Sequence, residues 1–303
     1  MSKAAAVGPF RPASTDVRAH HRLPQRSRRY APPDRAPVVV GIDGSRESLN
    51  AAGFAVREAQ LWRRPMMLLH AYGRRPRYLQ GESAQVVDNV VDELKLPKNV
   101  HVETRLVDGD AAPAMLRAGP AASMLVVGRH RSGSGAHLLS GSVSSVLSSH
   151  APCPVMVISE AWHAEQHAEG PVVVAVNADL ENADLLSFAF RRAHLSGVSL
   201  RVLHPFPDAA VDQRSVRVAD IVALVDQWRA QYPAVRVTTQ YAHDDSAAAI
   251  AAAWTASLIV VGQPRSLTGA GSWLRSVGYA VVRHTIRPVA VIPRSHVSSA
   301  RVA

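Results

Sequence analysis

Short apolar runs rich in valine and isoleucine alternate with stretches of helical apolar spacing through residues 37–294. In the first part of the chain, the runs predict strands at residues 38–42, 66–70, 100–106, 124–127 and 154–158. The stretches between them predict helices that include residues 49–62, 84–97, 111–118 and 143–150. This alternation is typical of a doubly wound α/β domain, in which helices flank a five-stranded, mainly parallel sheet.

The same pattern occurs twice with a constant offset of 134 residues. Val38–Asp43 returns as Val172–Asn177, and Val126–Gly128 returns as Val260–Gly262. A constant offset over many matches indicates a tandem duplication without net insertion. We therefore expect two domains of the same fold class in one chain. The predicted divisions are a tail (1–36), copy one (37–159), a linker (160–170), copy two (171–294) and a second tail (295–303).

Each copy ends in an apolar strand that would leave an open sheet edge, at Pro154–Ile158 and at Pro288–Ile292. Open apolar edges tend to pair with other strands. We therefore expect these two strands to pack together, so that the copies form a pseudo-dimer within one chain. A higher oligomer and an unidentified protein partner stay open.

The net charge of +10 is concentrated at the N-terminus. Residues 1–36 hold eight Lys and Arg against two Asp, in a Pro- and Ala-rich stretch without periodicity. This composition predicts a disordered basic tail rather than a specific nucleic-acid site. Neither a signal-peptide core nor an apolar run of the ~20 residues that span a bilayer is found, and Cys153 is the one cysteine. We expect a cytoplasmic protein without a membrane partner.

Motifs for common catalytic sites are missing from the sequence, including G-x-S-x-G, H-E-x-x-H and the P-loop. His70 and His204 end apolar strands and are expected to be structural. His163 and His167 stand four residues apart in the linker without a third ligand, so no metal site is predicted. Cys153 is expected to pack in the interior. The chain is predicted not to be an enzyme, although slow ATPase activity stays open.

A glycine-rich loop follows the fourth predicted strand of copy one, from Gly128 to Ser145. Exposed backbone N–H groups and a helix N-terminus attract phosphates, so such a loop is a candidate anion site. Asp43 ends the first strand and Ala71 follows the second, while Gly141-Ser142 opens the last helix. In a doubly wound sheet these ends meet at one edge.

Both copies resemble the universal stress protein family over nearly all of residues 37–294. Its nucleotide-binding members carry glycine, two residues, glycine, nine residues, then glycine with serine or threonine. Gly128 and Gly141-Ser142 match the outer landmarks, and Arg131 stands at the middle glycine. The resemblance implies that copy one binds ATP or AMP, with Mg²⁺ accompanying the ATP. It also implies the contact residues Asp43, Ala71, Gly128, Gly141, Ser142 and Val143, and Arg131, at the position of the middle glycine, is a further candidate.

Arg131 departs from the family pattern in a way that allows two interpretations. Its guanidinium either adds a charge-assisted hydrogen bond to a phosphate or obstructs a loop that needs glycine. Copy two departs further, since Asn177 replaces the acidic residue, and Arg265 and Arg275 replace two glycines. We expect copy two to be a structural partner without a nucleotide.

The sequence thus favours a stress-response or regulatory protein that binds an adenine nucleotide in copy one. The alternative is a nucleotide-free scaffold of the same fold, whose loops serve protein contacts. A third class, an ATP pyrophosphatase or nucleotidyl transferase, is disfavoured because the S-G-G-x-D-S and H-I-G-H motifs are missing.

Overall fold

The computed structural model describes most of both copies. The described residues are 35–73, 80–129, 142–163, 169–176, 183–205, 214–242, 255–263, 281–282 and 285–294. Several predicted features lie outside them: the basic tail up to residue 34, Arg131, Gly141, His167, Asn177, Arg265 and Arg275.

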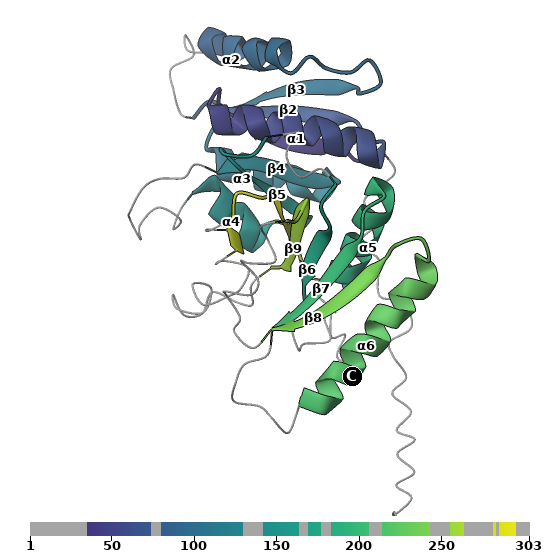
Figure 1. The fold of residues 1–303 in the computed structure, drawn as a ribbon. Coiled ribbons are helices and arrows are strands. Elements are labelled where there is room, and N and C mark those ends of the chain that lie inside the picture. The colour runs from purple at the N-terminus through teal and green to yellow at the C-terminus, as the bar shows by residue number, and fades with distance from the viewer. Residues whose placement is uncertain are drawn as a thin grey trace, which may run out of the picture.

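Strands and helices alternate in both copies, as the apolar pattern predicts (Figure 1). Copy one contains β1 (Val38–Ile42), α1 (Arg46–Trp62), β2 (Met66–Ala71), α2 (Gln80–Glu93), β3 (Val102–Val107), α3 (Ala111–Ala118), β4 (Met124–Arg129), α4 (Val143–His150) and β5 (Val155–Ser159). Copy two contains β6 (Val172–Ala175), α5 (Ala183–Ser196), β7 (Leu200–Pro205), α6 (Arg214–Gln231), β8 (Val237–Ala242), β9 (Leu258–Gly262) and β10 (Val289–Ile292).

The strands of both copies form one continuous ten-stranded sheet with the order β3-β2-β1-β4-β5-β10-β9-β6-β7-β8. Pairing within each copy is parallel, and the two copies are joined by the antiparallel pair β5 and β10. The predicted fold class is therefore confirmed, and so is the predicted packing of the two end strands. The edge strand of each copy, β5 or β10, thus lies at the centre of the combined sheet, where the two copies join.

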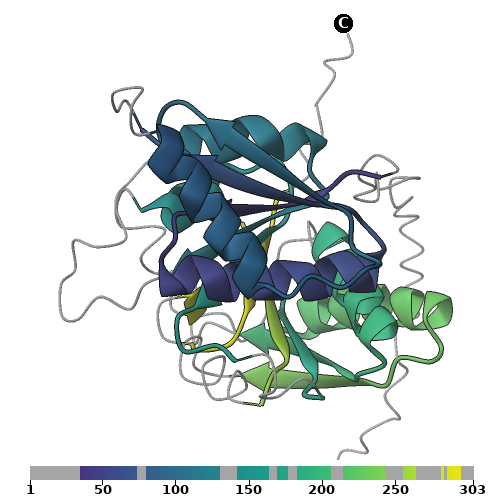
Figure 2. The same cartoon turned by 90° about the horizontal axis from the view of Figure 1, so that it is seen from above.

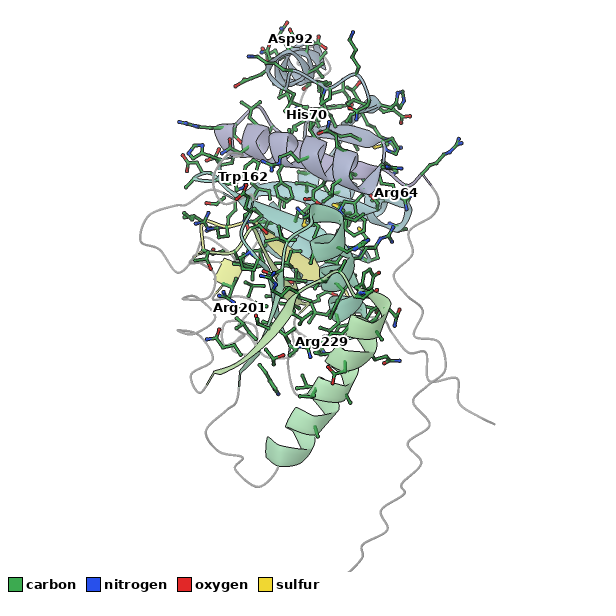
Figure 3. The ribbon with its side chains drawn as sticks, turned by 45° about the vertical axis from the view of Figure 1, so that its right-hand side comes forward. Arg64, His70, Asp92, Trp162, Arg201 and Arg229 are labelled. Carbon is green, nitrogen blue, oxygen red and sulfur yellow. The ribbon has the colours of Figure 1, made fainter. Side chains whose placement is uncertain are left out.

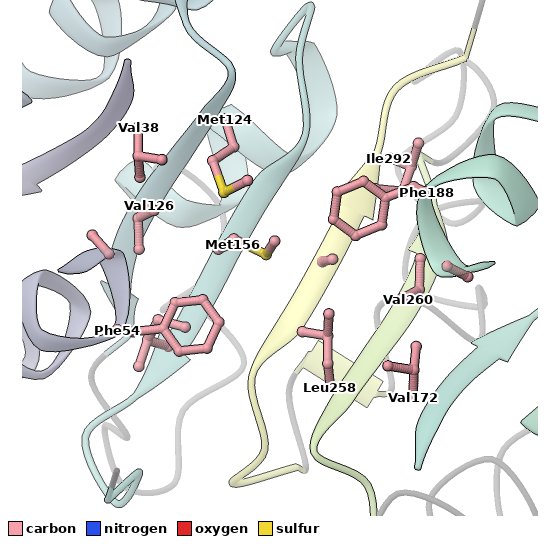
Figure 4. Close-up of a cluster of buried hydrophobic side chains, with 14 of the residues drawn as sticks. Val38, Phe54, Met124, Val126, Met156, Val172, Phe188, Leu258, Val260 and Ile292 are labelled. Carbon is pink, nitrogen blue, oxygen red and sulfur yellow. The ribbon is translucent and has the colours of Figure 1, made fainter. Parts of the chain in front are cut away.

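Alternating residues of the inner strands face two different hydrophobic clusters. Val38 and Val40 lie in one cluster, and Val39 lies in the other. The first cluster is covered by α1, α2, α5 and α6 and continues from copy one into copy two (Figure 4). Helices α1 and α5 lie side by side over the join (Figures 1 and 2). The second cluster also contains residues of both copies, so the two copies share their core on both faces of the sheet.

Some predicted boundaries shift in the structure. Strand β2 includes Ala71, which was expected to follow it, and β4 continues past residue 127 through Arg129. The helix predicted at 84–97 spans Gln80–Glu93, because Lys95 has a left-handed φ of 43° and Pro97 follows. The strand predicted at 100–106 spans Val102–Val107. Within the described ranges, helices long and apolar enough to cross a membrane are absent.

Candidate functional site

A cavity of about 330 Å³ opens at the carboxyl ends of β1, β2 and β4. The chain leaves β1 toward β2 on one side and later returns to place β4 on its other side. This reversal of strand order is the point where doubly wound sheets bind ligands. The cavity is lined by Gly41, Ile42, Asp43, Ser45, Glu47, Ser48, Leu69, Ala71, Ala111, Met115, Val127, Gly128 and Val143.

Four of the seven residues predicted for the site line this cavity: Asp43, Ala71, Gly128 and Val143. They come from four segments that are far apart in the sequence. Ser142 is the next residue to Val143 and caps α4, outside the lining set. Arg131 and Gly141 lie outside the described residues, so their place relative to the cavity stays a prediction.

The Asp43 carboxylate is held in place by the residue that caps α1. Its Oδ1 accepts hydrogen bonds from the Ser45 backbone N–H at 3.0 Å and from the Ser45 hydroxyl at 2.5 Å. Desolvation raises the pKa of Asp43 most strongly, but hydrogen bonds from Ser45 and Ser48, with the charge of His70, bring it below its ordinary value. Asp43 therefore presents an ionised carboxylate to the cavity at neutral pH.

The turn between β1 and α1 is built by the sequence Asp43-Gly44-Ser45. Gly44 has a φ of +81°, a conformation that residues with a side chain seldom adopt. Ser45 caps α1, with its Oγ accepting from the Ser48 backbone N–H at 3.2 Å. The N-terminus of α1 and its partial positive charge thus lie at the cavity mouth beside Asp43.

The N-terminus of α4 adjoins the other side of the cavity. Ser142 caps this helix, and its Oγ accepts from the Ser145 backbone N–H at 3.3 Å. The same oxygen lies 3.3 Å from the Ser144 hydroxyl. The Ser142 hydroxyl predicted for phosphate contact is therefore also a helix cap, so replacing it would perturb α4 as well as a ligand.

The sequence did not identify several lining residues, including Ser45, Ser48, Ala111 and Met115. Ser45 and Ser48 carry a local signal, since serines at this spacing after a strand predict a helix cap. Met115 lies on the helix that follows β3, and its position depends on how α3 packs across the sheet. Only the three-dimensional arrangement reveals that contribution.

A second hollow of about 420 Å³ adjoins the first and shares Asp43, Ala71 and Ala111 with it. Its wall also includes Glu82 and Asp110. Within the described residues, no group of three His, Cys, Asp or Glu side chains is placed to hold a metal ion. The two hollows thus share part of their walls, and the second one is lined by the carboxylates of Asp43, Glu82 and Asp110.

The histidine and cysteine predicted to be structural are buried in copy one. His70, at the end of β2 (Figure 3), lies within hydrogen-bond distance of the Ile42 carbonyl oxygen, at 2.8 Å from Nδ1. Cys153 is 2% exposed, and burial raises the pKa of its thiol to about 12. Both findings agree with the predicted packing roles.

Two doubly wound copies, joined edge to edge, with a ligand-sized cavity at the switch point of copy one, define the class of protein. The universal stress protein family matches residues 35–159 and 170–293. The chain therefore belongs to the universal stress protein family, as a member with two family domains.

Individual relatives match over the whole duplicated region. Universal stress protein Rv2623 of Mycobacterium tuberculosis is 29% identical over 288 residues, which cover 85% of this chain and 96% of that protein. A universal stress protein structure from Archaeoglobus fulgidus has a TM-score of 0.67 at 17% identity, over 86% of this chain and 97% of that chain. At this identity the likeness shows the fold. A universal stress protein solved in complex with cAMP has 23% identity and a TM-score of 0.36, over 40% of this chain and 95% of that chain.

Proposed function

We propose that copy one binds an adenine nucleotide, ATP or AMP, and that the protein acts as a regulatory stress-response protein rather than an enzyme. The observation that supports this most strongly is the shared cavity of Asp43, Ala71, Gly128 and Val143. These are four of the positions that the family resemblance assigns to nucleotide contact, and they converge at the switch point of the sheet.

The lining offers chemistry suited to each part of a nucleotide. Leu69, Ala71, Met115 and Val127 provide an apolar wall that fits an adenine ring. The ionised Asp43 carboxylate is an acceptor for ribose hydroxyls. The N-terminus of α4, beside Val143, provides backbone N–H groups for phosphates. Mg²⁺ would enter with ATP through its phosphates.

The purified full-length protein should carry the nucleotide if binding is tight. Mass spectrometry of the small molecules released by heating should therefore detect ATP, ADP or AMP in proportion to the protein. An Ala71→Leu variant, which adds bulk to the cavity wall, should release much less. An unfolding curve matching that of wild type would show that the variant fails in binding rather than in folding.

A nucleotide that binds weakly is lost during purification, so titration of the protein with added nucleotide must accompany this experiment. Absence of any adenine nucleotide in the released material, together with absence of binding to ATP, ADP, AMP or cAMP at millimolar concentration, would overturn the proposal. The nucleotide-free scaffold would then be the better account of the same fold.

A further inference from the structure

The two copies meet around a pseudo-twofold axis that passes through β5 and β10. Met156 pairs with Ala290, the residue at the equivalent position of the repeat. Val155 pairs with Val291, and Val157 pairs with Val289, so the pairs on either side of Met156 are related by the same symmetry. This is the arrangement of a symmetric dimer, in which one surface meets another of the same kind. The backbone pairing by itself therefore fits two like copies as well as two different ones.

A buried ion pair breaks this symmetry. Glu58 of α1 contacts Arg192 of α5, and Arg192 stands at the position equivalent to Glu58, 134 residues later. Arg192 Nη2 donates to Glu58 Oε1 at 2.8 Å, and Arg192 Nε donates to Oε2 at 3.2 Å. The side chains of Glu58 and Arg192 are 1% and 12% exposed, so water screens this bidentate contact little.

Each partner is oriented by the residue four positions further along its own helix. Trp62 Nε1 donates to Glu58 Oε2 at 2.8 Å, and Arg192 Nη1 donates to the Ser196 hydroxyl oxygen. Trp62 and Ser196 are themselves equivalent positions in the repeat. Trp62 also stacks on Phe188 of copy two, with ring centroids 5.5 Å apart. The pair is thus fixed by different supports on its two sides.

The two side chains that meet on the pseudo-twofold axis also differ in volume. Met156 and Ala290 face each other and are fully buried, and Met156 points across the join toward β10 (Figure 4). Two methionines at this point would overfill the space, and two alanines would leave it underfilled. Charge and volume therefore both complement each other only when the copies differ.

We propose that the Glu58–Arg192 pair directs copy one onto copy two and excludes the pairing of like copies between chains. Two first copies meeting in this geometry would bury Glu58 against Glu58. Two second copies would bury Arg192 against Arg192. Like charges that are removed from water disfavour association strongly, so the surface of each copy fits the other kind of copy. This proposal does not depend on nucleotide binding.

Charge reversal in the full-length protein tests the pairing rule within one chain. Glu58→Arg and Arg192→Glu each create a like-charge contact, and each should lower the folding equilibrium constant by about a hundredfold or more in urea titrations. The double variant restores opposite charges. Its folding equilibrium constant should be roughly tenfold higher, or more, than the value expected if the two single effects simply combined. Recovery should stay partial, because the Trp62 N–H loses its acceptor.

An exposed ion pair provides a matched control. Asp226 and Arg229 lie 2.9 Å apart on α6, with side chains 55% and 43% exposed. Asp226→Arg should therefore change the folding equilibrium constant by less than about fivefold. A double variant of Glu58 and Arg192 that shows no recovery, or a control that loses as much as Glu58→Arg, would overturn the proposal.

Mixing the two single variants tests partner choice between chains. In a mixture, copy one of the Glu58→Arg chain can pair with copy two of the Arg192→Glu chain, and the two remaining copies can form the native contact. Both contacts then join opposite charges. Co-refolding of differently tagged chains should give a mixed dimer with recovered stability, which neither variant forms alone. If the mixture keeps the masses and unfolding curves of the separate variants, the pairing rule is wrong.

Discussion

Gly128 of β4 lies directly against the backbone carbonyl of Glu47 in the first turn of α1. A β-carbon at residue 128 would be 2.5 Å from the Glu47 oxygen and 2.6 Å from its carbonyl carbon, both backbone atoms that cannot rotate away. Gly128 therefore lets α1 approach the sheet at the cavity mouth. Its role in placing Asp43 and Ser45 is independent of any contact with a ligand.

This contact predicts that Gly128→Ala destabilises the fold. Overpacking of this kind costs about 1–3 kcal/mol in the free energy of unfolding, which chemical denaturation can measure. Gly262 is the equivalent residue in copy two, and among the residues that the structure describes a β-carbon there would meet no atom within 4 Å. Gly262→Ala is therefore the matched control and should leave stability nearly unchanged. Equal losses from the two variants would contradict the role assigned to Gly128.

The lowered pKa of Asp43 predicts a pH dependence in the acidic range. Since the folded-state pKa lies below the unfolded value of about 3.9, the stabilisation is fully present above that value. It is lost as the pH falls through the lower folded-state pKa. Carboxyl NMR titration of the native protein should place the Asp43 transition below that of an ordinary aspartate, and Ser45→Ala should raise it. A transition at or above the ordinary value would refute this electrostatic account.

Burial of Cys153 predicts a thiol that does not react in the folded protein. With Cys153 only 2% exposed and the pKa of its thiol raised to about 12, almost no thiolate is present or accessible at neutral pH. Iodoacetamide should leave the native protein unmodified and should label Cys153 fully in denaturant, as mass spectrometry can determine. Rapid labelling of the native chain would show that this part of the core opens.

Arg131 gives a prediction that rests on the sequence alone, because it lies outside the described residues. If its guanidinium contacts a phosphate, Arg131→Ala should weaken ATP binding roughly tenfold, given ~1.5–3 kcal/mol for a charge-assisted hydrogen bond. If Arg131 obstructs the loop, Arg131→Gly should strengthen binding. Titration of both variants separates the two interpretations, and a contact would also weaken with rising salt.

The apolar pattern was sufficient to predict the strands, their grouping in two copies and the join of the end strands. These features follow from local periodicity and from one constant offset in the sequence. Asp43 and Ala71 were identified because they stand at strand ends, which a parallel sheet brings to one edge. For the same reason, the position of the cavity followed once the fold class was known.

The sequence could not reveal contacts that depend on how helices pack. Met115 enters the cavity wall only because α3 crosses the sheet near β1. The fit of Gly128 against Glu47 depends on the distance between α1 and β4. Glu58 and Arg192 occupy equivalent repeat positions, but their contact requires the pseudo-twofold axis to pass between α1 and α5. Such distances are set by tertiary packing rather than by periodicity.

Titration calorimetry of the full-length protein with ATP and AMP, in the presence of Mg²⁺, tests the central claim most directly. The account predicts one nucleotide per chain, bound roughly tenfold more weakly after Asp43→Ala removes an ionised hydrogen-bond partner. Asn177→Ala, the equivalent change in copy two, should leave affinity and stoichiometry unchanged. Two nucleotides per chain, equal losses from both variants, or no binding at millimolar concentration would contradict a nucleotide site in copy one.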